Sequence, residues 1–205
     1  VLPPELLQAA IATHQKYITL SDADGKFSSN FIILSNRLGD AARDAVIIAG
    51  NQRVLRARLA DAEFFSQQDQ ARQLESYLPA LGDVTFYEGL GSIHDKAIRM
   101  EKLASAIAPH MLSANPKAAS RAARLAKADL VTGMVGEFPE LQGIMGGYYA
   151  AASGEDKAVC DAITAHYRPQ GPADDLPATH EAMVVALADK IDTLVGFFGI
   201  DAKPT

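Results

Sequence analysis

The last helical segment of the chain limits the fold more than any other feature. Residues 183–198 are apolar on nearly every side of a helix, so we expect this helix in the centre of a bundle, surrounded by others. The same segment carries Asp189 and Asp192. Burying an unpaired carboxylate is costly, and Asp189 therefore requires a cation, a metal ion or hydrogen-bond donors from a neighbouring element.

Most of the chain ahead of this segment also has helical patterning. Leu55, Leu59 and Ala62 recur at helical spacing, which predicts a helix over residues 46–70. Ser92 is a suitable N-cap for the next helix. Further helices are expected over residues 92–108, 117–135, 141–152 and 155–166. We therefore predict a mostly α chain in which residues 46–205 form one helical bundle.

Residues 1–45 have a different pattern. A helix is predicted over residues 5–14, and two β-rich runs follow it, at residues 16–20 and 31–34. The segment between these runs has the composition of a turn, Asp22-Ala23-Asp24-Gly25-Lys26. Two strands alone are marginally stable in water. We expect this β-hairpin to complete a sheet whose other strands precede residue 1, so that residues 1–45 are the end of an upstream α/β domain.

Charge and cysteine content limit the classes of function. A net charge of −6 repels polyanions, which argues against a dedicated high-affinity nucleic-acid module, so any RNA contact must be local. Cys160 is the only cysteine and cannot form an intrachain disulfide, which fits a reducing, cytoplasmic location. No apolar run reaches transmembrane length, and we expect no membrane partner. The first residues lack both an initiator Met and a signal peptide, which is typical of an internal piece of a longer protein.

The dipeptide His94-Asp95 and the distant Asp189 resemble part of the motif of the HD-type metal-dependent phosphohydrolases. In that superfamily a first His, a central His-Asp pair and a late Asp converge on divalent metal ions. The resemblance would make His94 the first His and Asp189 the late Asp. At the central pair this chain has Lys127 where the superfamily has His.

Lys127 changes what this HD-like site can do. A protonated lysine cannot ligate a metal ion, but its ammonium group can hold a positive charge at the same place. We therefore predict a degenerate HD-like site made of His94, Lys127, Asp129 and Asp189, without a metal ion and with Lys127 beside Asp189 or Asp129. An active HD-type phosphohydrolase is the alternative.

A second resemblance covers nearly the whole chain. The signature helix of the glycyl-tRNA synthetase β subunit is similar to residues 50–65 of this chain, GNQRVLRARLADAEFF. Further segments resemble the same family in the same order, at residues 14–17, 22–26, 31–36, 91–96, 127–132, 137–143, 166–167 and 186–198. Two positions depart from the family pattern, because His94 stands where Tyr or Leu is more usual and Gly147 where Arg is expected.

This resemblance implies a part of a bacterial glycine–tRNA ligase, a class II aminoacyl-tRNA synthetase with an α2β2 arrangement that uses ATP and Mg²⁺. In that family the α subunit activates glycine, and the β subunit handles tRNA through a B3/B4-like domain, an HD-like helical domain and an anticodon-binding region. Residues 1–45 would be the end of the B3/B4-like domain, and residues 46–205 would be the HD-like domain. The expected partners are the α subunit, tRNA(Gly) and a second β subunit. The chain itself is expected to help position tRNA, to hold no catalytic residue and no cofactor, and to be inactive alone.

Two groups of basic residues are candidates for contacts with tRNA. Lys117, Arg121 and Arg124 lie at i, i+4 and i+7, so they form a basic stripe on one helix face. Arg53 and Arg56 also share a face, and the planar guanidinium group of Arg fits a phosphate. Both groups are equally compatible with a solvated surface or with ion pairs inside the protein. We expect the stripe to contribute more to tRNA binding than Arg53 or Arg56.

Overall fold

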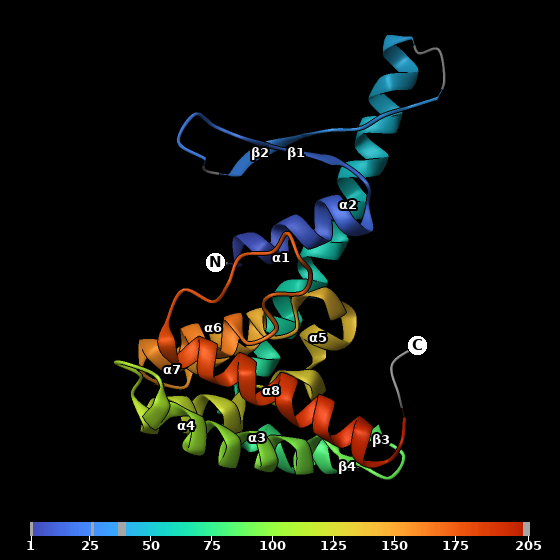
Figure 1. The fold of residues 1–205 in the computed structure, drawn as a ribbon. Helices are drawn as coiled ribbons and strands as arrows, with labels where there is room; N and C mark the ends of the chain where they lie inside the picture. The colour runs from blue at the N-terminus through green and yellow to red at the C-terminus, as the bar shows by residue number, and fades with distance from the viewer. Residues whose placement is uncertain (1, 26, 37–39, 203–205) are drawn as a thin grey trace. The chain divides into compact units, whose positions relative to one another are not determined.

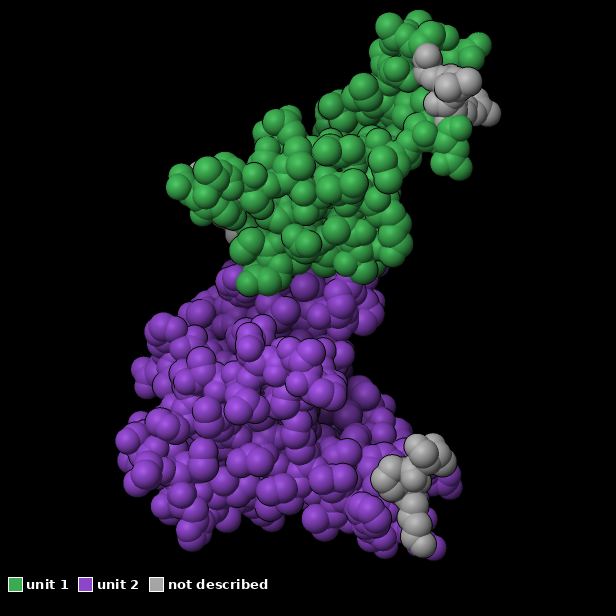
Figure 2. Space-filling view, turned by 45° about the horizontal axis from the view of Figure 1, so that its top comes forward, with its two compact units in different colours: residues 1–68 green, residues 69–205 purple. Residues whose placement is uncertain are grey.

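The computed structural model describes residues 2–25, 27–36 and 40–202. The chain divides into two compact units, residues 1–68 and residues 69–205, which Figure 2 shows in different colours. Helices make up most of the described residues, so the mostly α fold predicted from the sequence is confirmed. In the described part of the chain, no helix is both long and apolar enough to span a membrane.

The first unit contains the predicted hairpin. Its elements in chain order are α1 (Pro4–Gln8), the π-helix η1 (Ala9–His14), β1 (Ile18–Ser21), β2 (Phe27–Ile32) and all but the last two residues of α2 (Ala41–Gln70). The two strands pair antiparallel, so the predicted hairpin is confirmed (Figure 1). Its small core consists of Ile11, Tyr17 and Leu55, with Phe27, Phe31, Ile33 and Leu59 packed around them.

The second unit is a helical bundle with one short hairpin. Its elements in chain order are η2 (Leu74–Asp83), β3 (Thr85–Tyr87), β4 (Gly91–Ser92), α3 (Ile93–Ile107), η3 (Ala108–His110), α4 (Pro116–Leu125), η4 (Ala128–Val131), α5 (Gly133–Glu137), η5 (Pro139–Leu141), α6 (Ile144–Ala152), α7 (Lys157–Ala165) and α8 (His180–Gly199). Helix α8 packs against α3, α4 and α7 (Figure 1). The η elements of this unit are 3-10 helices.

Side-chain caps fix where several of these helices begin. Ser92 caps α3 as predicted, because its hydroxyl accepts a hydrogen bond from the Asp95 amide while the Asp95 carboxylate accepts from the Ser92 amide. The single helix predicted over residues 117–135 is wrong. Helix α4 ends at Leu125, and Thr132 caps a new helix, α5, by accepting from the Val135 amide.

The first residue of the second unit is a buried carboxylate. Asp69 is 2% exposed and accepts hydrogen bonds from the Gly133 amide at 3.0 Å, the Met134 amide at 2.9 Å and the Tyr149 hydroxyl at 2.9 Å. These donors satisfy the carboxylate without a cation. Asp69 therefore attaches the end of α2 to the start of α5 and to α6 within this unit.

Helix α8 is only partly central. Val184, Val185 and Ala188 are buried in the bundle, as the apolar pattern predicted. The second half of the helix nevertheless exposes Leu194 and Val195 to solvent. The prediction that other helices surround α8 on all sides is therefore wrong for the half that follows Ala188, where apolar side chains face solvent.

Candidate functional site

A buried lysine lies at the centre of the second unit. Lys127 is the N-cap of η4, and its Nζ lies 2.8 Å from His166 Nε2, at the end of α7, and 3.0 Å from Asp189 Oδ2, on α8. Its side chain is 4% exposed, and its Nζ also lies 3.8 Å from the centre of the Tyr167 ring. The structure thus brings together two of the four residues predicted for the HD-like site, Lys127 and Asp189.

The hydrogen bonds of His166 define its tautomer. Its Nδ1 lies 2.6 Å from the carbonyl oxygen of Ile163, which can only accept, so Nδ1 carries the proton. The lone pair of Nε2 therefore faces Lys127, and the ammonium group donates to it. Burial lowers the pKa of His166 to about 3, and the positive charge of Lys127 acts in the same direction. His166 is accordingly a neutral acceptor.

A second buried lysine extends the cluster along α8. Lys96, on α3, has its Nζ 2.9 Å from Asp189 Oδ1, outside hydrogen-bonding geometry but close enough for an ion pair, and 3.1 Å from Asp192 Oδ2. Asp192 Oδ1 in turn lies 2.5 Å from Arg99 Nε. Cations and carboxylates therefore alternate in the order Arg99, Asp192, Lys96, Asp189 and Lys127. We call these five residues, together with His166, the charge cluster.

The alternation favours the charged forms of Asp189 and Lys127, although both are largely buried. Burial opposes ionisation of Asp189, but Lys127 and Lys96 outweigh this effect and hold the pKa of Asp189 well below its usual range. Burial lowers the pKa of Lys127 to about 8, although the charge of Asp189 acts in the opposite direction. At neutral pH Lys127 is therefore mainly an ammonium, and it compensates the carboxylate on α8.

Asp129 lies near this cluster but has its own partners. Its Oδ2 accepts hydrogen bonds from the Gly143 amide at 2.5 Å and the Gly146 amide at 2.9 Å, and no hydrogen bond or ion pair joins it to Lys127 among the described residues. Burial raises the pKa of Asp129 to about 6, against the effect of the two amides. A Cβ at Gly146 would lie 2.9 Å from Asp129 Oδ2, so this position has room only for glycine.

His94, the fourth predicted residue, lies apart from the charge cluster. It is half-buried in the first turn of α3, and none of the cluster's hydrogen bonds or ion pairs, as far as the structure describes the chain, involves it. Among the described residues, the α3 side chains that form ion pairs with α8 are Lys96 and Arg99. Sequence reasoning missed this pairing, although Lys96 and Arg99 stand three apart on one helix, and Asp189 and Asp192 stand three apart on another. Matching spacings of opposite charge could have revealed it.

Most of the predicted basic stripe is compensated by carboxylates. Arg121 Nη1 lies 2.8 Å from Glu75 Oε1, and Arg121 Nη2 lies 2.7 Å from Glu155 Oε1. These bonds raise the pKa of Arg121 and lower that of Glu75. Arg124 Nη1 lies 3.7 Å from Glu101 Oε2. Two of the three stripe residues therefore carry little net positive charge to the surface.

The other candidate cations remain available. Arg53 and Arg56 are exposed on α2, and within residues 2–25, 27–36 and 40–202 no hydrogen bond or ion pair involves their guanidinium groups. Lys117, at the start of α4, is also exposed, and the structure gives no partner for its ammonium group among the described residues. These three side chains can meet a polyanion without first breaking an internal ion pair.

The inner part of the charge cluster is closed to solvent. Lys96 and Lys127 are each 3% exposed, and His166 is 0% exposed, so a substrate has no access to these groups. Among the described residues, no three His, Cys, Asp or Glu side chains gather in a way that could hold a metal ion. The arrangement is therefore suited to holding α3, α7 and α8 together through fixed charges.

Comparison with known proteins gives one consistent result. The family model described as glycyl-tRNA synthetase beta subunit matches residues 1–205. The glycine–tRNA ligase beta subunits of Aromatoleum aromaticum, Phenylobacterium zucineum and Rhodospirillum centenum are 54%, 52% and 51% identical to the chain over 205, 210 and 207 residues. Each alignment covers the whole chain but only 29%, 31% and 29% of these relatives, so the chain spans less than a third of their length.

Proposed function

Because the chain belongs to the glycyl-tRNA synthetase β-subunit family, we propose that it is a tRNA-handling segment of a glycine–tRNA ligase. The complete enzyme would be a cytoplasmic class II synthetase of α2β2 arrangement, and it would use ATP and Mg²⁺ to attach glycine to tRNA(Gly). The chain itself would supply neither a catalytic residue nor a cofactor site. The observation that carries this proposal is the match over the whole chain, combined with a polar core that no substrate can enter.

Within this function, residues 1–45 would end a B3/B4-like domain and residues 46–205 would form an HD-like domain. The division into compact units falls elsewhere, between residues 68 and 69, near the end of α2. The two divisions differ because the compact units are defined by contacts within the structure, whereas the domain boundaries are taken from the resemblance to the family. Helix α2 would then be common to both, since it begins near one boundary and ends near the other.

The HD-like centre would be structural. Lys127 Nζ occupies the position between His166 Nε2 and Asp189 Oδ2, two groups of the kind that ligate divalent metals. A tethered ammonium group at this point can neutralise the carboxylate as a metal ion would. The competing phosphohydrolase function would need a metal ion at the position that Lys127 fills.

Contacts with tRNA phosphates are best assigned to Arg53 and Arg56. Their guanidinium groups are exposed and unpaired among the described residues, whereas Arg121 is held by two glutamates. Using Arg121 for RNA would cost its existing ion pairs, while Arg53 and Arg56 lose only hydration. This order reverses the one expected from the spacing of the basic stripe.

The test is a double substitution in the reconstituted α2β2 enzyme, Arg53→Ala with Arg56→Ala. We expect weaker tRNA binding and a log–log salt slope that is shallower by about 0.9 for each duplex phosphate that the enzyme no longer neutralises. Glycine-dependent ATP/pyrophosphate exchange should not change. Arg43→Ala is the matched control, because Arg43 lies on the same helix and pairs with Asp40. If tRNA affinity and salt slope both stayed at wild-type values, these arginines would be an ordinary solvated face and the chain would act as scaffold.

A further inference from the structure

From Leu187 onward, α8 carries a continuous apolar face. Leu187, Leu194, Val195 and Phe198 are 42%, 53%, 66% and 57% exposed, and Ile191 is half-buried between them. Their spacing is i, i+4, i+7, i+8 and i+11, which places all five within an arc of about 100° on the helix. We call these five residues the α8 stripe.

The α8 stripe carries no charge. The ionisable residues of this half of the helix face elsewhere, because Asp189 and Asp192 pair with Lys96. Lys190 Nζ lies 3.4 Å and 3.0 Å from the carbonyl oxygens of residues 167 and 168. Leu187, Leu194, Val195 and Phe198 thus resemble the inside of a protein in composition, although they face solvent.

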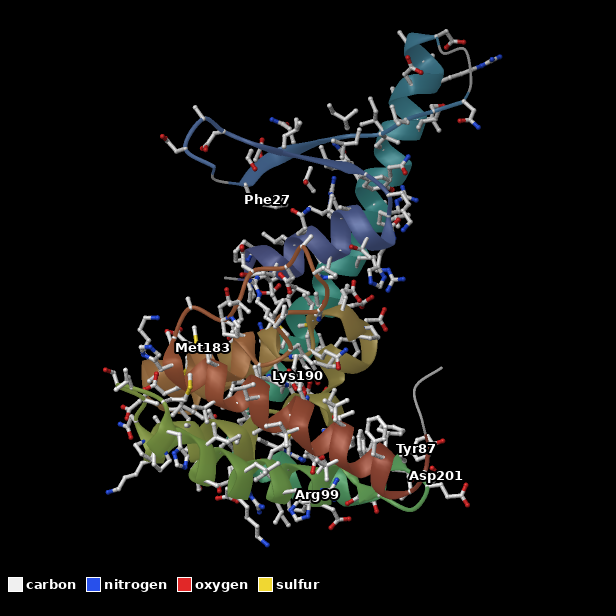
Figure 3. All side chains as sticks on the ribbon, viewed as in Figure 1. Phe27, Tyr87, Arg99, Met183, Lys190 and Asp201 are labelled. Carbon is white, nitrogen blue, oxygen red and sulfur yellow. The ribbon has the colours of Figure 1, made fainter. Side chains whose placement is uncertain are left out.

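An exposed aromatic side chain packs against Phe197, near the end of α8. Tyr87, on β3, is 44% exposed, and its ring centre lies 4.8 Å from that of Phe197. Figure 3 shows Tyr87 beside the last turns of α8. Aliphatic side chains next to an exposed tyrosine are typical of the core of a contact surface, where charged residues are depleted.

We propose that the α8 stripe is a permanent contact surface for polypeptide of the same β subunit that lies outside residues 1–205. The spacing of Leu187, Ile191, Leu194 and Phe198 is that of a helix seam, which fits a second amphipathic helix packed at a shallow angle. A face without charges is typical of permanent rather than exchanging contacts.

The length of the relatives favours a segment of the same β subunit as the partner of the α8 stripe. The matched region is 29% of the Aromatoleum aromaticum protein, so more than two thirds of that subunit lies outside it. A segment joined to the chain has a far higher effective concentration than a separate molecule. The inference rests on the proposed function, since it takes the full-length protein to be a β subunit of this family.

The experiment measures access to position 194 in the full-length β subunit without the α subunit. Leu194→Cys would be labelled with a maleimide and read by peptide mass spectrometry, which distinguishes it from other cysteines. Ala106→Cys is the matched control, because Ala106 is an exposed helical residue on α3. We expect labelling at 194 to be roughly tenfold slower than at 106 and independent of protein concentration.

Three results would overturn the inference. Equal labelling at 194 and 106 would mean that the face is free. Protection that appears only at high concentration, together with a dimer in sedimentation, would assign the stripe to a second copy. Protection that appears only when the α subunit is added would assign it to that subunit.

A second measurement does not depend on cysteine chemistry. Leu194→Lys should lower the thermal midpoint of the full-length subunit, because a covered face would have to accept a charge. Leu112→Lys, at a position that is 88% exposed, should leave the midpoint unchanged. Equal midpoints for the two variants would also overturn the inference. Neither readout involves tRNA, so failure of the Arg53 and Arg56 contacts would be seen separately.

Discussion

At the scale of single residues, Asp189 connects two buried lysines. Its carboxylate faces Lys127 through one oxygen and Lys96 through the other, at 3.0 Å and 2.9 Å. Both lysines are buried. Asp189 is the one ion-pair partner of Lys127 among the described residues, whereas Lys96 also pairs with Asp192. The cluster therefore behaves as one unit, in which loss of a single member leaves a charge uncompensated in a medium of low polarity.

The first prediction concerns this dependence. Asp189→Ala should lower the free energy of unfolding by about 3–5 kcal/mol, because it leaves two ammonium groups buried without their shared partner. Asp161→Ala is the control, since Asp161 pairs with Lys157 at the surface and its loss should cost only about 0–1 kcal/mol. Urea unfolding of both variants decides the matter. A similarly small loss of unfolding free energy in both variants would show that Lys127 and Lys96 do not require Asp189.

The second prediction concerns His166 and pH. The folded protein keeps His166 neutral with a pKa of about 3, whereas the unfolded chain protonates it near its ordinary value. The unfolded state then binds the extra proton, so stability is lost as the pH falls below about 6.5. Asp129 acts in the opposite direction, because its raised pKa of about 6 lets the folded state take up a proton in the same range.

A comparison with His166→Gln isolates this contribution, because Asp129 is present in both proteins. Between pH 7 and pH 5 the wild type should lose about 2 kcal/mol more unfolding free energy than the variant. Urea unfolding at pH 5, 6 and 7 measures the difference. Parallel pH profiles for the two proteins would mean that His166 keeps an ordinary pKa in the fold.

At the scale of elements, local signals were predictable and distant ones were not. The cap at Ser92 and the hairpin in residues 1–45 follow from a few neighbouring residues, and both were predicted correctly. The break after α4 was not predicted, and in the segment that follows it Asp129 accepts hydrogen bonds from the amides of Gly143 and Gly146, which no local pattern reveals. The pairing of Lys96 on α3 with Asp192 on α8 joins residues more than ninety positions apart in the sequence. Sequence reasoning did not match the three-residue spacing of Lys96 and Arg99 with that of Asp189 and Asp192.

Gly146 gives the third prediction. A methyl group there would lie 2.9 Å from both Asp129 Oδ2 and Ile163 Cγ2, so Gly146→Ala should destabilise the protein by about 1–3 kcal/mol through overpacking. Gly136→Ala is the control, because no atom lies near its added methyl group and alanine favours the helix by about 0.4–1 kcal/mol. Thermal or urea unfolding measures the stability of the Gly146→Ala and Gly136→Ala variants against the wild type. A stabilising Gly146→Ala would show that Asp129 can move away from α6.

At the scale of the whole molecule, acidic residues outnumber basic ones, and several of the basic residues form internal ion pairs. The chain has 19 Lys and Arg residues against 25 Asp and Glu, and Lys96, Arg99, Arg121 and Lys127 are already occupied by carboxylates. The net charge of −6 opposes the approach of RNA. On the proposed function, this segment would help orient a bound tRNA, and most of the binding free energy would come from the remainder of the enzyme.

The last prediction concerns glycine activation by the chain alone. Glycine activation requires a site that holds ATP beside glycine, whereas the polar centre of this chain is filled by its own charges and closed to substrates. The 205-residue chain, purified alone, should therefore show no glycine-dependent ATP/pyrophosphate exchange, while the reconstituted α2β2 enzyme should show it in the same assay. Asp189→Ala in the chain serves as a further control, because any activity from a contaminating synthetase would not respond to it. Exchange above background by the chain alone, abolished in an Asp189→Ala variant that keeps the wild-type circular-dichroism spectrum, would mean that the charge cluster takes part in chemistry and would contradict its structural role.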